Sequence, residues 1–212
     1  MDIMEQRQVS DMKLYTIIGG VNGAGKSSLT GVLKSMGTDL GPIIDVDKIA
    51  QSLGGRNVEA GKAAIQKIED YLKHGVSFTQ ETTLAGHRPT QIAQKAKALG
   101  YHIRLCYVGL NSLEDSLIRI ENRLKRGGHG IPEEDVTRRY DNRFPDLFKV
   151  LVYCDEATFF DNDNGFREVG NYKNGEIHRT GDYDPTWFSE LRKSHEAELI
   201  RSSSKDKDIV ER

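Results

Sequence analysis

The octapeptide Gly20-Val21-Asn22-Gly23-Ala24-Gly25-Lys26-Ser27 matches G-x-x-x-x-G-K-S/T, the phosphate-binding P-loop motif. Residues 14–18 before it are apolar and rich in β-branched and aromatic side chains, which is typical of a buried parallel strand. After it, apolar residues recur at helical spacing until Gly37, namely Leu29, Val32, Leu33 and Met36. The sequence therefore predicts a strand, a glycine-rich turn and a helix, which is the structural context of a P-loop.

The motif predicts a site for ATP with Mg²⁺. Glycines allow backbone N–H groups to approach phosphate oxygens, and the helix that begins near Lys26 directs its positive end at the same anion. Lys26 can reach the β- and γ-phosphates, and the Ser27 hydroxyl can ligate Mg²⁺. The alternative is a glycine-rich turn with an incidental lysine. The residues expected to contact ATP are Gly20, Asn22, Gly23, Ala24, Gly25, Lys26, Ser27 and Ser28.

Length and composition narrow the class of protein. The 212 residues suit one domain over 1–212, with residues 1–12 and 203–212 loosely ordered. The net charge of −2 argues against a general nucleic-acid or membrane-surface protein. Cys106 and Cys154 both lie in apolar stretches, which favours reduced thiols over a disulfide. No apolar run approaches membrane-spanning length and the start has no apolar signal region, so we expect a cytoplasmic protein.

Strand and helix patterns alternate along the chain. Strands are expected at 14–18, 41–47, 76–81, 101–110 and 157–161. Helices are expected from 26, at 57–74, 89–100 and 113–124, and from 132 and 185. Asn174-Gly175 predicts a hairpin over 167–180. The alternation predicts an α/β fold with a P-loop kinase-like core: a mostly parallel sheet with helices on both faces, and a carboxyl-terminal hairpin and helix.

Three acids fall where strands of this sheet should end, which is where open α/β sheets bind ligands. A phosphotransferase needs a carboxylate to orient an acceptor hydroxyl and accept its proton. If the second strand persists, Asp45 and Asp47 share one face, and Asp47 lies nearer the ligand, so Asp47 is the candidate base. Its alternative role is helix capping. Glu81, followed by Thr82 and Thr83, is expected to contact substrate or Mg²⁺-bound water, with capping as the alternative.

Arginines predict a lid. Arg119, Arg123 and Arg126 form one helical stripe, and beyond the glycine-rich break at 127–130 stand Arg138 and Arg139. Guanidinium groups stabilise the charge that develops during phosphoryl transfer, so Arg123, Arg126 and Arg139 are candidate catalytic residues and Arg138 a substrate contact. The alternative is a solvated face paired with glutamates. Arg138 and Arg139 are about 100° apart on a helix, so both need not face the site.

Other motifs are absent from the sequence. His129 has no partner at ligand spacing, so a loop residue is expected rather than a metal ligand. There is no apolar strand ending in an Asp-Glu pair, as in motor-type ATPases, and no Asn-Lys-x-Asp motif for guanine. Both absences favour small kinases over motors and GTPase switches.

Taken together, the motifs resemble those of the zeta-toxin-like P-loop kinases in their shorter bacterial form. The matching pieces are residues 19–28, 45–50, 78–86, 123–124 with 127–132, 138–140 and 160–162, in the family's order. The resemblance implies Asp47 at the catalytic-base position and Glu81 near the acceptor. It also implies that Lys26, Ser27 and Asn162 bind ATP and Mg²⁺, with the lid arginines on the phosphates. Asp45 and Asn142 depart from the family, which often has Asn and Arg there, with Arg143 displaced by one.

In that family the acceptor is typically a UDP-activated amino sugar such as UDP-N-acetylglucosamine, and members commonly act as toxins held inactive by a small antitoxin. We therefore expect an ATP- and Mg²⁺-dependent kinase that phosphorylates a hydroxyl, with Asp45, Glu81, Thr82, Thr83 and Arg138 on the substrate. A small antitoxin is a possible partner, and neither a membrane nor nucleic acid is expected. Two alternatives stay open: an ATP-hydrolysing or ATP-sensing switch that acts through a partner protein, and a non-catalytic nucleotide-binding module.

Overall fold

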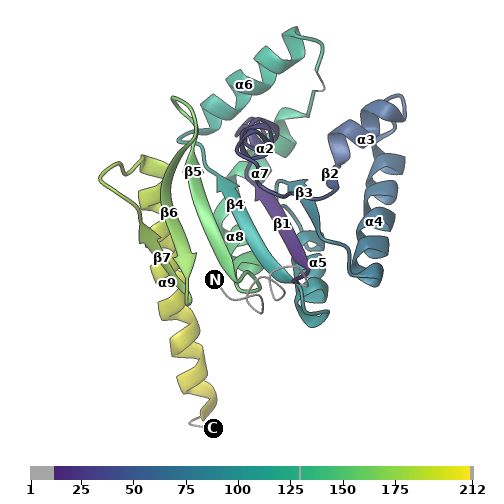
Figure 1. Ribbon diagram of the computed structural model, residues 1–212. Helices are drawn as coiled ribbons and strands as arrows, with labels where there is room; N and C mark the ends of the chain where they lie inside the picture. The colour runs from purple at the N-terminus through teal and green to yellow at the C-terminus, as the bar shows by residue number, and fades with distance from the viewer. Residues whose placement is uncertain (1–11, 129, 211–212) are drawn as a thin grey trace.

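The computed structural model describes residues 12–128 and 130–210, and its strands form one twisted sheet (Figure 1). The strand order is β2-β3-β1-β4-β5-β6-β7. The bounds are β1 (Leu14–Gly19), β2 (Ile43–Asp45), β3 (Phe78–Thr82), β4 (His102–Val108), β5 (Glu156–Asp161), β6 (Arg167–Lys173) and β7 (Glu176–Arg179). The first five strands in this order, from β2 to β5, run parallel to one another. Strand β6 is antiparallel to both of its neighbours, β5 and β7. The predicted mostly parallel sheet is confirmed.

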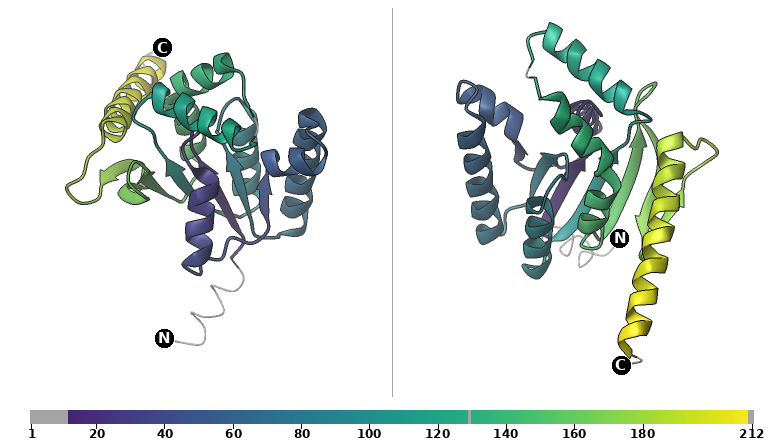
Figure 2. Two further views of the ribbon diagram at one scale, coloured as in Figure 1. Left: turned by 90° about the horizontal axis from the view of Figure 1, so that it is seen from above. Right: turned by 180° about the vertical axis from the view of Figure 1, so that it is seen from behind.

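Helices cover both faces of the sheet (Figure 2). Their bounds are α2 (Lys26–Ser35), α3 (Val46–Ser52), α4 (Asn57–His74), α5 (Arg88–Ala98), α6 (Leu113–Lys125), α7 (Glu133–Asp141), α8 (Arg143–Leu151) and α9 (Thr186–Val210). The larger core cluster joins one face of the sheet to apolar residues of α4, α5, α8 and α9. The smaller cluster joins the other face to Leu29 of α2 and Tyr140 of α7. Within the described residues, no helix is long and apolar enough to cross a membrane.

The start of the carboxyl-terminal helix packs tightly on the sheet, and the rest of α9 extends beyond it (Figure 1). Trp187 and Phe188 at the start of α9 are 1% and 0% exposed. A Cβ at Gly109 would lie 2.2 Å from the Trp187 ring, and one at Gly170 would lie 2.1 Å from the Phe188 ring. Only glycine leaves space for these two rings, so the hairpin and α9 are built into the core of the fold.

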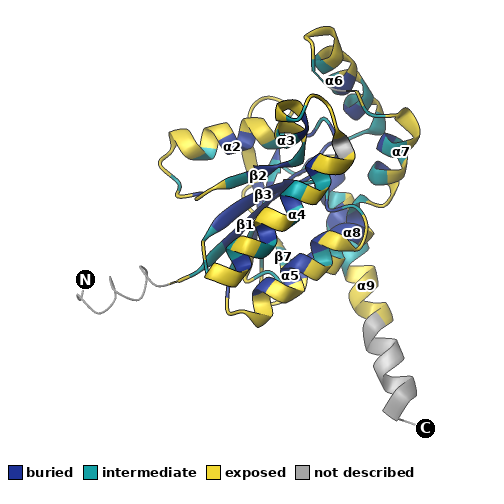
Figure 3. Ribbon diagram, turned by 90° about the vertical axis from the view of Figure 1, so that its right-hand side faces the viewer, coloured by how far each residue is buried: buried dark blue, intermediate teal, exposed yellow. Residues whose placement is uncertain are grey.

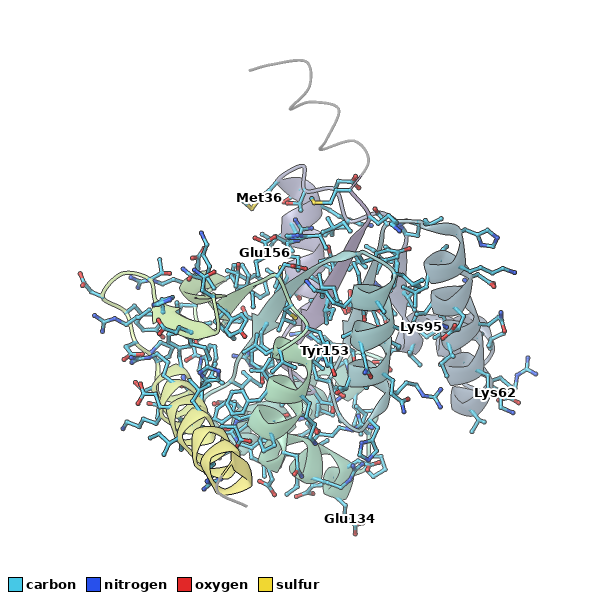
Figure 4. All side chains as sticks on the ribbon, turned by 90° about the horizontal axis from the view of Figure 1, so that it is seen from below. Met36, Lys62, Lys95, Glu134, Tyr153 and Glu156 are labelled. Carbon is cyan, nitrogen blue, oxygen red and sulfur yellow. The ribbon has the colours of Figure 1, made fainter. Side chains whose placement is uncertain are left out.

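Burial follows the layers. The central strands are buried, whereas the outward faces of α2, α4 and α5 are exposed (Figure 3). In a view from the end of the sheet opposite the P-loop, the side chains of Met36, Lys62 and Glu134 point outward into solvent (Figure 4). The apolar repeat predicted after the P-loop is therefore only half buried: Leu29 packs in the core, but Val32 and Met36 are exposed.

Two expected elements end earlier than predicted. The second strand stops at Asp45, because the Asp45 carboxylate accepts hydrogen bonds from the backbone N–H groups of Asp47 and Lys48 and so begins α3. The predicted extent of this strand, to Asp47, was wrong, and the condition under which Asp45 and Asp47 would share a face is not met. The helix expected from 132 is divided at Asn142 into α7 and α8.

The hairpin prediction is confirmed. Strands β6 and β7 pair antiparallel, and the turn residues Asn174 and Gly175 both have positive φ, at 55° and 85°. Of the two segments expected to be loosely ordered, residues 1–11 and 211–212 lie outside the described residues. The backbone of 203–210 is helical and forms the end of α9.

Candidate active site

The P-loop connects β1 to α2 at the carboxyl edge of the sheet. Gly20 has φ of 143°, and a Cβ there would lie 2.4 Å from the Val108 carbonyl oxygen. Gly25 caps α2 with φ of 99°, and a Cβ there would lie 2.3 Å from the Asn162 side-chain nitrogen. The path of the loop therefore requires glycine at both positions. It aims the amino terminus of α2 into a cavity.

This cavity has a volume of about 620 Å³ and collects most of the predicted site residues. Those that line it are Asn22, Gly23, Gly25, Lys26, Ser27, Ser28, Asp45, Asp47, Glu81, Thr82, Thr83, Arg123 and Arg139. Five predicted residues do not line it: Gly20, Ala24, Arg126, Arg138 and Asn162. Gln80, Arg119 and Asp135 also line it and were not predicted as site residues.

Lys26 is folded back onto its own loop. Its Nζ donates hydrogen bonds to the carbonyl oxygens of Gly20 at 2.9 Å and Val21 at 3.0 Å. Burial lowers the pKa of Lys26 to about 8, although the nearby carboxylates of Glu81 and Asp47 favour its charged form. The lysine is thus held in place by the loop, and its charge is incompletely compensated in the protein alone.

Glu81 holds the first turn of α2 rather than capping a helix. Its Oε2 accepts a hydrogen bond from Ser27 Oγ at 2.6 Å, and its Oε1 accepts one from Thr30 Oγ1 at 2.7 Å. Glu81 is only 7% exposed, and it lies on β3 directly beneath the loop. The Ser27 hydroxyl is therefore positioned by a buried carboxylate.

Asp45 and Asp47 have different roles. The Asp45 side chain is buried and is used as the cap of α3, with a further ion pair to Lys48 at 3.3 Å. The Asp47 side chain is 66% exposed and lies 3.8 Å from Nη1 of Arg123 on the lid. The capping role that was the alternative for Asp47 thus belongs to Asp45. The Asp47 carboxylate is not used as a cap, and Asp47 lines the cavity.

The lid arginines divide between the cavity and other surfaces. Arg139 lines the cavity and donates from Nη1 to the Asn22 side chain at 3.1 Å. Arg138 is turned away and pairs with Asp135 at 2.6 Å, so the solvated-face alternative holds for it. Arg126 lies with Arg119 and Arg123 around a separate notch of about 410 Å³.

Arg143 does not take the place of the arginine that the resembled family often has where Asn142 stands. Arg143 pairs with Glu190 at 3.0 Å, and its guanidinium lies 4.0 Å from the centre of the Tyr140 ring. It does not line the cavity. His129 lies outside the described residues. Among the described residues, no group of three or more His, Cys, Asp or Glu side chains could hold a metal ion.

The P-loop is braced by Asn162, Arg119 and Ser116. Asn162 Nδ2 donates to the Ala24 carbonyl at 3.0 Å, and Arg119 Nη2 donates to the Asn162 carbonyl at 3.0 Å. The buried Ser116 hydroxyl donates to the Asn22 carbonyl at 2.6 Å. The helical spacing of Arg119 with Arg123 could have indicated that Arg119 faces the P-loop. No sequence pattern indicates the role of Ser116.

The brace continues into the carboxyl-terminal segment. Asp161, next to Asn162, is 2% exposed and accepts hydrogen bonds from Trp187 Nε1 at 2.8 Å and from the Tyr183 hydroxyl at 3.1 Å. Tyr183 and Trp187 of the carboxyl-terminal segment therefore support the residue next to Asn162, which bonds the P-loop.

Comparisons with known proteins place the fold. No protein-family model matches the chain. An uncharacterized protein of Haemophilus influenzae is 38% identical over 127 residues, which is 57% of this chain and 88% of that protein. The AvrRxo1-ORF1:-ORF2 complex with ATP superposes with a TM-score of 0.61 at 17% identity, over 90% of this chain and 78% of that chain. The PezAT chromosomal toxin-antitoxin system of Streptococcus pneumoniae gives 0.53 at 19% identity, over 90% and 86%.

Proposed function

The chain belongs to the same family as the Haemophilus influenzae protein and has the fold of the zeta-toxin-like P-loop kinases, and on this basis we propose that it is an ATP- and Mg²⁺-dependent phosphotransferase. The proposed reaction moves the γ-phosphate of ATP to a hydroxyl of a nucleotide sugar such as UDP-N-acetylglucosamine. One observation carries the proposal: an exposed carboxylate, Asp47, shares a single cavity with Lys26 of the P-loop and with Arg123 and Arg139 of the lid.

The loop and the lid supply the phosphate end of the site. Backbone N–H groups of the loop and the amino terminus of α2 face the phosphates, and Lys26 exchanges its loop carbonyls for phosphate oxygens. Arg139, already bonded to Asn22, brings a guanidinium to the same phosphates. These groups stabilise the charge that develops on the γ-phosphoryl oxygens as the bond to the β-phosphate breaks.

The donor set fits Mg²⁺. Ser27 presents a hydroxyl at the start of α2, and the buried Glu81 carboxylate lies behind it, which suits an ion that binds chiefly to phosphates and water. When bound, Mg²⁺ would neutralise phosphate charge, with Ser27 as its protein ligand. Glu81 positions the Ser27 hydroxyl for this purpose.

Asp47 is the proposed base. Its carboxylate accepts the proton of the acceptor hydroxyl while the hydroxyl oxygen attacks the γ-phosphorus from the side opposite the leaving oxygen. The Arg123 guanidinium, 3.8 Å from Asp47, connects the base to the phosphate end of the cavity. Closure of α6 and α7 over the cavity would exclude water from the transfer.

The structural neighbours motivate a proposal about partners. One is an ORF1:ORF2 complex and the other a toxin-antitoxin system. We propose that this chain likewise acts as a toxin and is held inactive by a small protein. Growth arrest on expression of the wild-type chain, absent with Asp47→Asn, would support this. Normal growth with both would contradict it.

The decisive experiment incubates the purified protein with ATP, Mg²⁺ and a panel of nucleotide sugars, with mass spectrometry to detect an added phosphate. Asp47→Asn is the test variant, and Asp182→Asn, an exposed acid outside the cavity, is its matched control. We expect a phosphorylated sugar from the wild type and the control, and none from Asp47→Asn, which should still bind ATP. Steady ATP loss with no phosphorylated sugar would instead indicate the ATPase or switch function.

A further inference from the structure

A buried polar pair lies within the apolar face of the sheet. Tyr15 on β1 is 0% exposed and Gln80 on β3 is 7% exposed. Both belong to the face that packs against α4 and α5, where Gln80 is in register with Ile17 and Ile44. The Tyr15 ring stacks on Phe78 with centroids 4.6 Å apart. A glutamine in such apolar surroundings costs free energy unless its polar atoms are hydrogen-bonded.

Tyr15 fixes the orientation of the Gln80 amide. The Tyr15 hydroxyl donates to Gln80 Oε1 at 2.5 Å, and no other acceptor among the described residues bonds this hydroxyl. Burial raises the pKa of Tyr15 far above its usual value, so the phenol keeps its proton and remains the donor. The amide oxygen of Gln80 is thereby held by the Tyr15 hydrogen bond, and the amide nitrogen faces away from Tyr15.

The amide nitrogen of Gln80 opens onto the active-site cavity. Gln80 lines that cavity, while its nitrogen is neither hydrogen-bonded to a described residue nor among the buried atoms without a partner. The amide nitrogen is therefore accessible to solvent from the cavity, which Thr82 of the same strand also lines. A pair of N–H donors is thus presented to the cavity that also holds Asp47, the proposed base.

The charges around Gln80 select the kind of oxygen that it can bind. Asp45 and Asp47 line the same cavity as Gln80, and Asp47 is already paired with Arg123 at 3.8 Å. The Gln80 amide carries no charge with which to compensate a phosphate. A neutral donor beside carboxylates suits a neutral oxygen, such as a sugar hydroxyl or an amide carbonyl.

We propose that Gln80 is a specificity-determining residue, which donates its amide N–H to a neutral oxygen of the acceptor, and that Tyr15 is the positioning residue that orients this amide. The inference rests on the proposed function and deepens it. It assigns an uncharged polar group of the acceptor to the part of the cavity that Gln80 of β3 lines.

Gln80→Glu is the sharpest test, because a carboxylate still accepts the Tyr15 hydrogen bond but replaces the N–H donors with an acceptor. We expect the KM for UDP-N-acetylglucosamine to rise about tenfold or more, while the KM for ATP stays within about twofold. The matched control is Gln91→Glu on the exposed face of α5, which should leave both values unchanged.

Tyr15→Phe tests the positioning role. Removal of the hydroxyl frees the amide to turn, so the KM for the sugar should rise several-fold with little change in kcat. Its control is Tyr101→Phe, which loses two hydrogen bonds, to the Tyr71 and Val76 carbonyls, away from the cavity. Tyr101→Phe should lower Tm as much as Tyr15→Phe or more but leave the KM unchanged.

The outcomes separate the two proposals. A wild-type protein that phosphorylates no sugar of the panel contradicts the proposed function and, with it, the role of Gln80. A wild-type protein that phosphorylates the sugar, with an unchanged sugar KM in Gln80→Glu or an equal rise in the KM for ATP, overturns the role of Gln80 alone. Equal KM values in Tyr15→Phe and Tyr101→Phe would overturn the role of Tyr15.

Discussion

The Ser27 hydroxyl lies 2.6 Å from Oε2 of Glu81, so the first turn of α2 is tied to the end of β3. The second oxygen of the carboxylate bonds Thr30 one turn further along the helix. A single buried acid thus sets where the hydroxyl of the P-loop lies relative to the sheet.

Glu81→Gln tests this arrangement. The amide keeps one acceptor but loses the charge, so the Ser27 hydroxyl is held less firmly and ion binding weakens. We expect turnover to fall about 100-fold and the Mg²⁺ concentration for half-maximal activity to increase, with ATP binding in EDTA little changed. Titration of activity with Mg²⁺ measures this, with Glu59→Gln on the exposed face of α4 as control. An unaltered Mg²⁺ dependence would argue against the role of Glu81.

The pKa of Lys26 predicts how ATP binding depends on pH. Only the ammonium form pairs with phosphate, and burial lowers its pKa to about 8, so affinity should fall by up to about tenfold per pH unit above pH 8. Calorimetry from pH 7 to 9.5, in buffers of different ionisation enthalpy, should detect proton uptake on binding near and above pH 8. Lys26→Arg keeps its charge throughout this range and should show neither effect.

The same shift predicts the stability of the protein without ATP. The folded pKa lies below the ordinary 10.5, so unfolding takes up a proton between about pH 8 and 10.5. Relative to Lys26→Met, the free energy of unfolding of the wild type should rise as pH increases through this window. Below the window, the wild type should be less stable by an amount that does not vary with pH. Urea unfolding of both proteins at pH 7 and pH 10 measures the difference, and a difference that does not vary with pH would contradict the shifted pKa.

Arg138 and Arg139 form a neighbouring pair for which the structure predicts opposite results. Arg139 reaches Asn22 in the cavity, whereas Arg138 pairs with Asp135 on an exposed surface. Arg139→Ala should lower kcat by about 100-fold or more, because a guanidinium is lost from the phosphate end. Arg138→Ala should change kcat by less than about threefold, as expected for an exposed ion pair. Steady-state kinetics of both variants decide the matter, and equal losses would show that the lid closes differently.

Asn162→Ala removes a hydrogen bond to the loop from outside the cavity. Loss of the bond to the Ala24 carbonyl should loosen the loop and raise the KM for ATP several-fold, with a small change in Tm. Asn164→Ala, in the same turn but exposed, is the matched control and should behave as wild type. If both variants keep the wild-type KM, the brace does not hold the loop in its binding conformation.

Local patterns predicted much of the fold. The P-loop, its flanking strand and helix, and the Asn174-Gly175 turn all follow from residues adjacent in the chain, where period and backbone preference decide the structure. The same reasoning failed at Asp45, because a side-chain cap competes with strand extension. It also failed at Met36, because helical spacing does not tell which part of an apolar face finds a partner.

The candidate site was predicted where it is local and missed where it depends on distant pairs. Lys26 and Ser27 were predicted from the P-loop motif and Glu81 from its place at the end of a strand, and all three line one cavity. Gln80 was missed because its meaning comes from Tyr15, 65 residues away in the sequence. Arg138, predicted on the substrate as a lid arginine, does not line the cavity, because packing sets the rotation of α7 about its own axis and a sequence pattern does not specify it.

The order of the elements has a consequence for protein synthesis. The P-loop and α2 leave the ribosome before β5 and α9 are made, yet Asn162 fixes the loop at Ala24, and Trp187 fixes Asp161 beside it. A nascent chain that lacks these last elements carries the nucleotide-binding loop without its support. The support of the P-loop is therefore complete only after α9 has been made and has docked on the sheet.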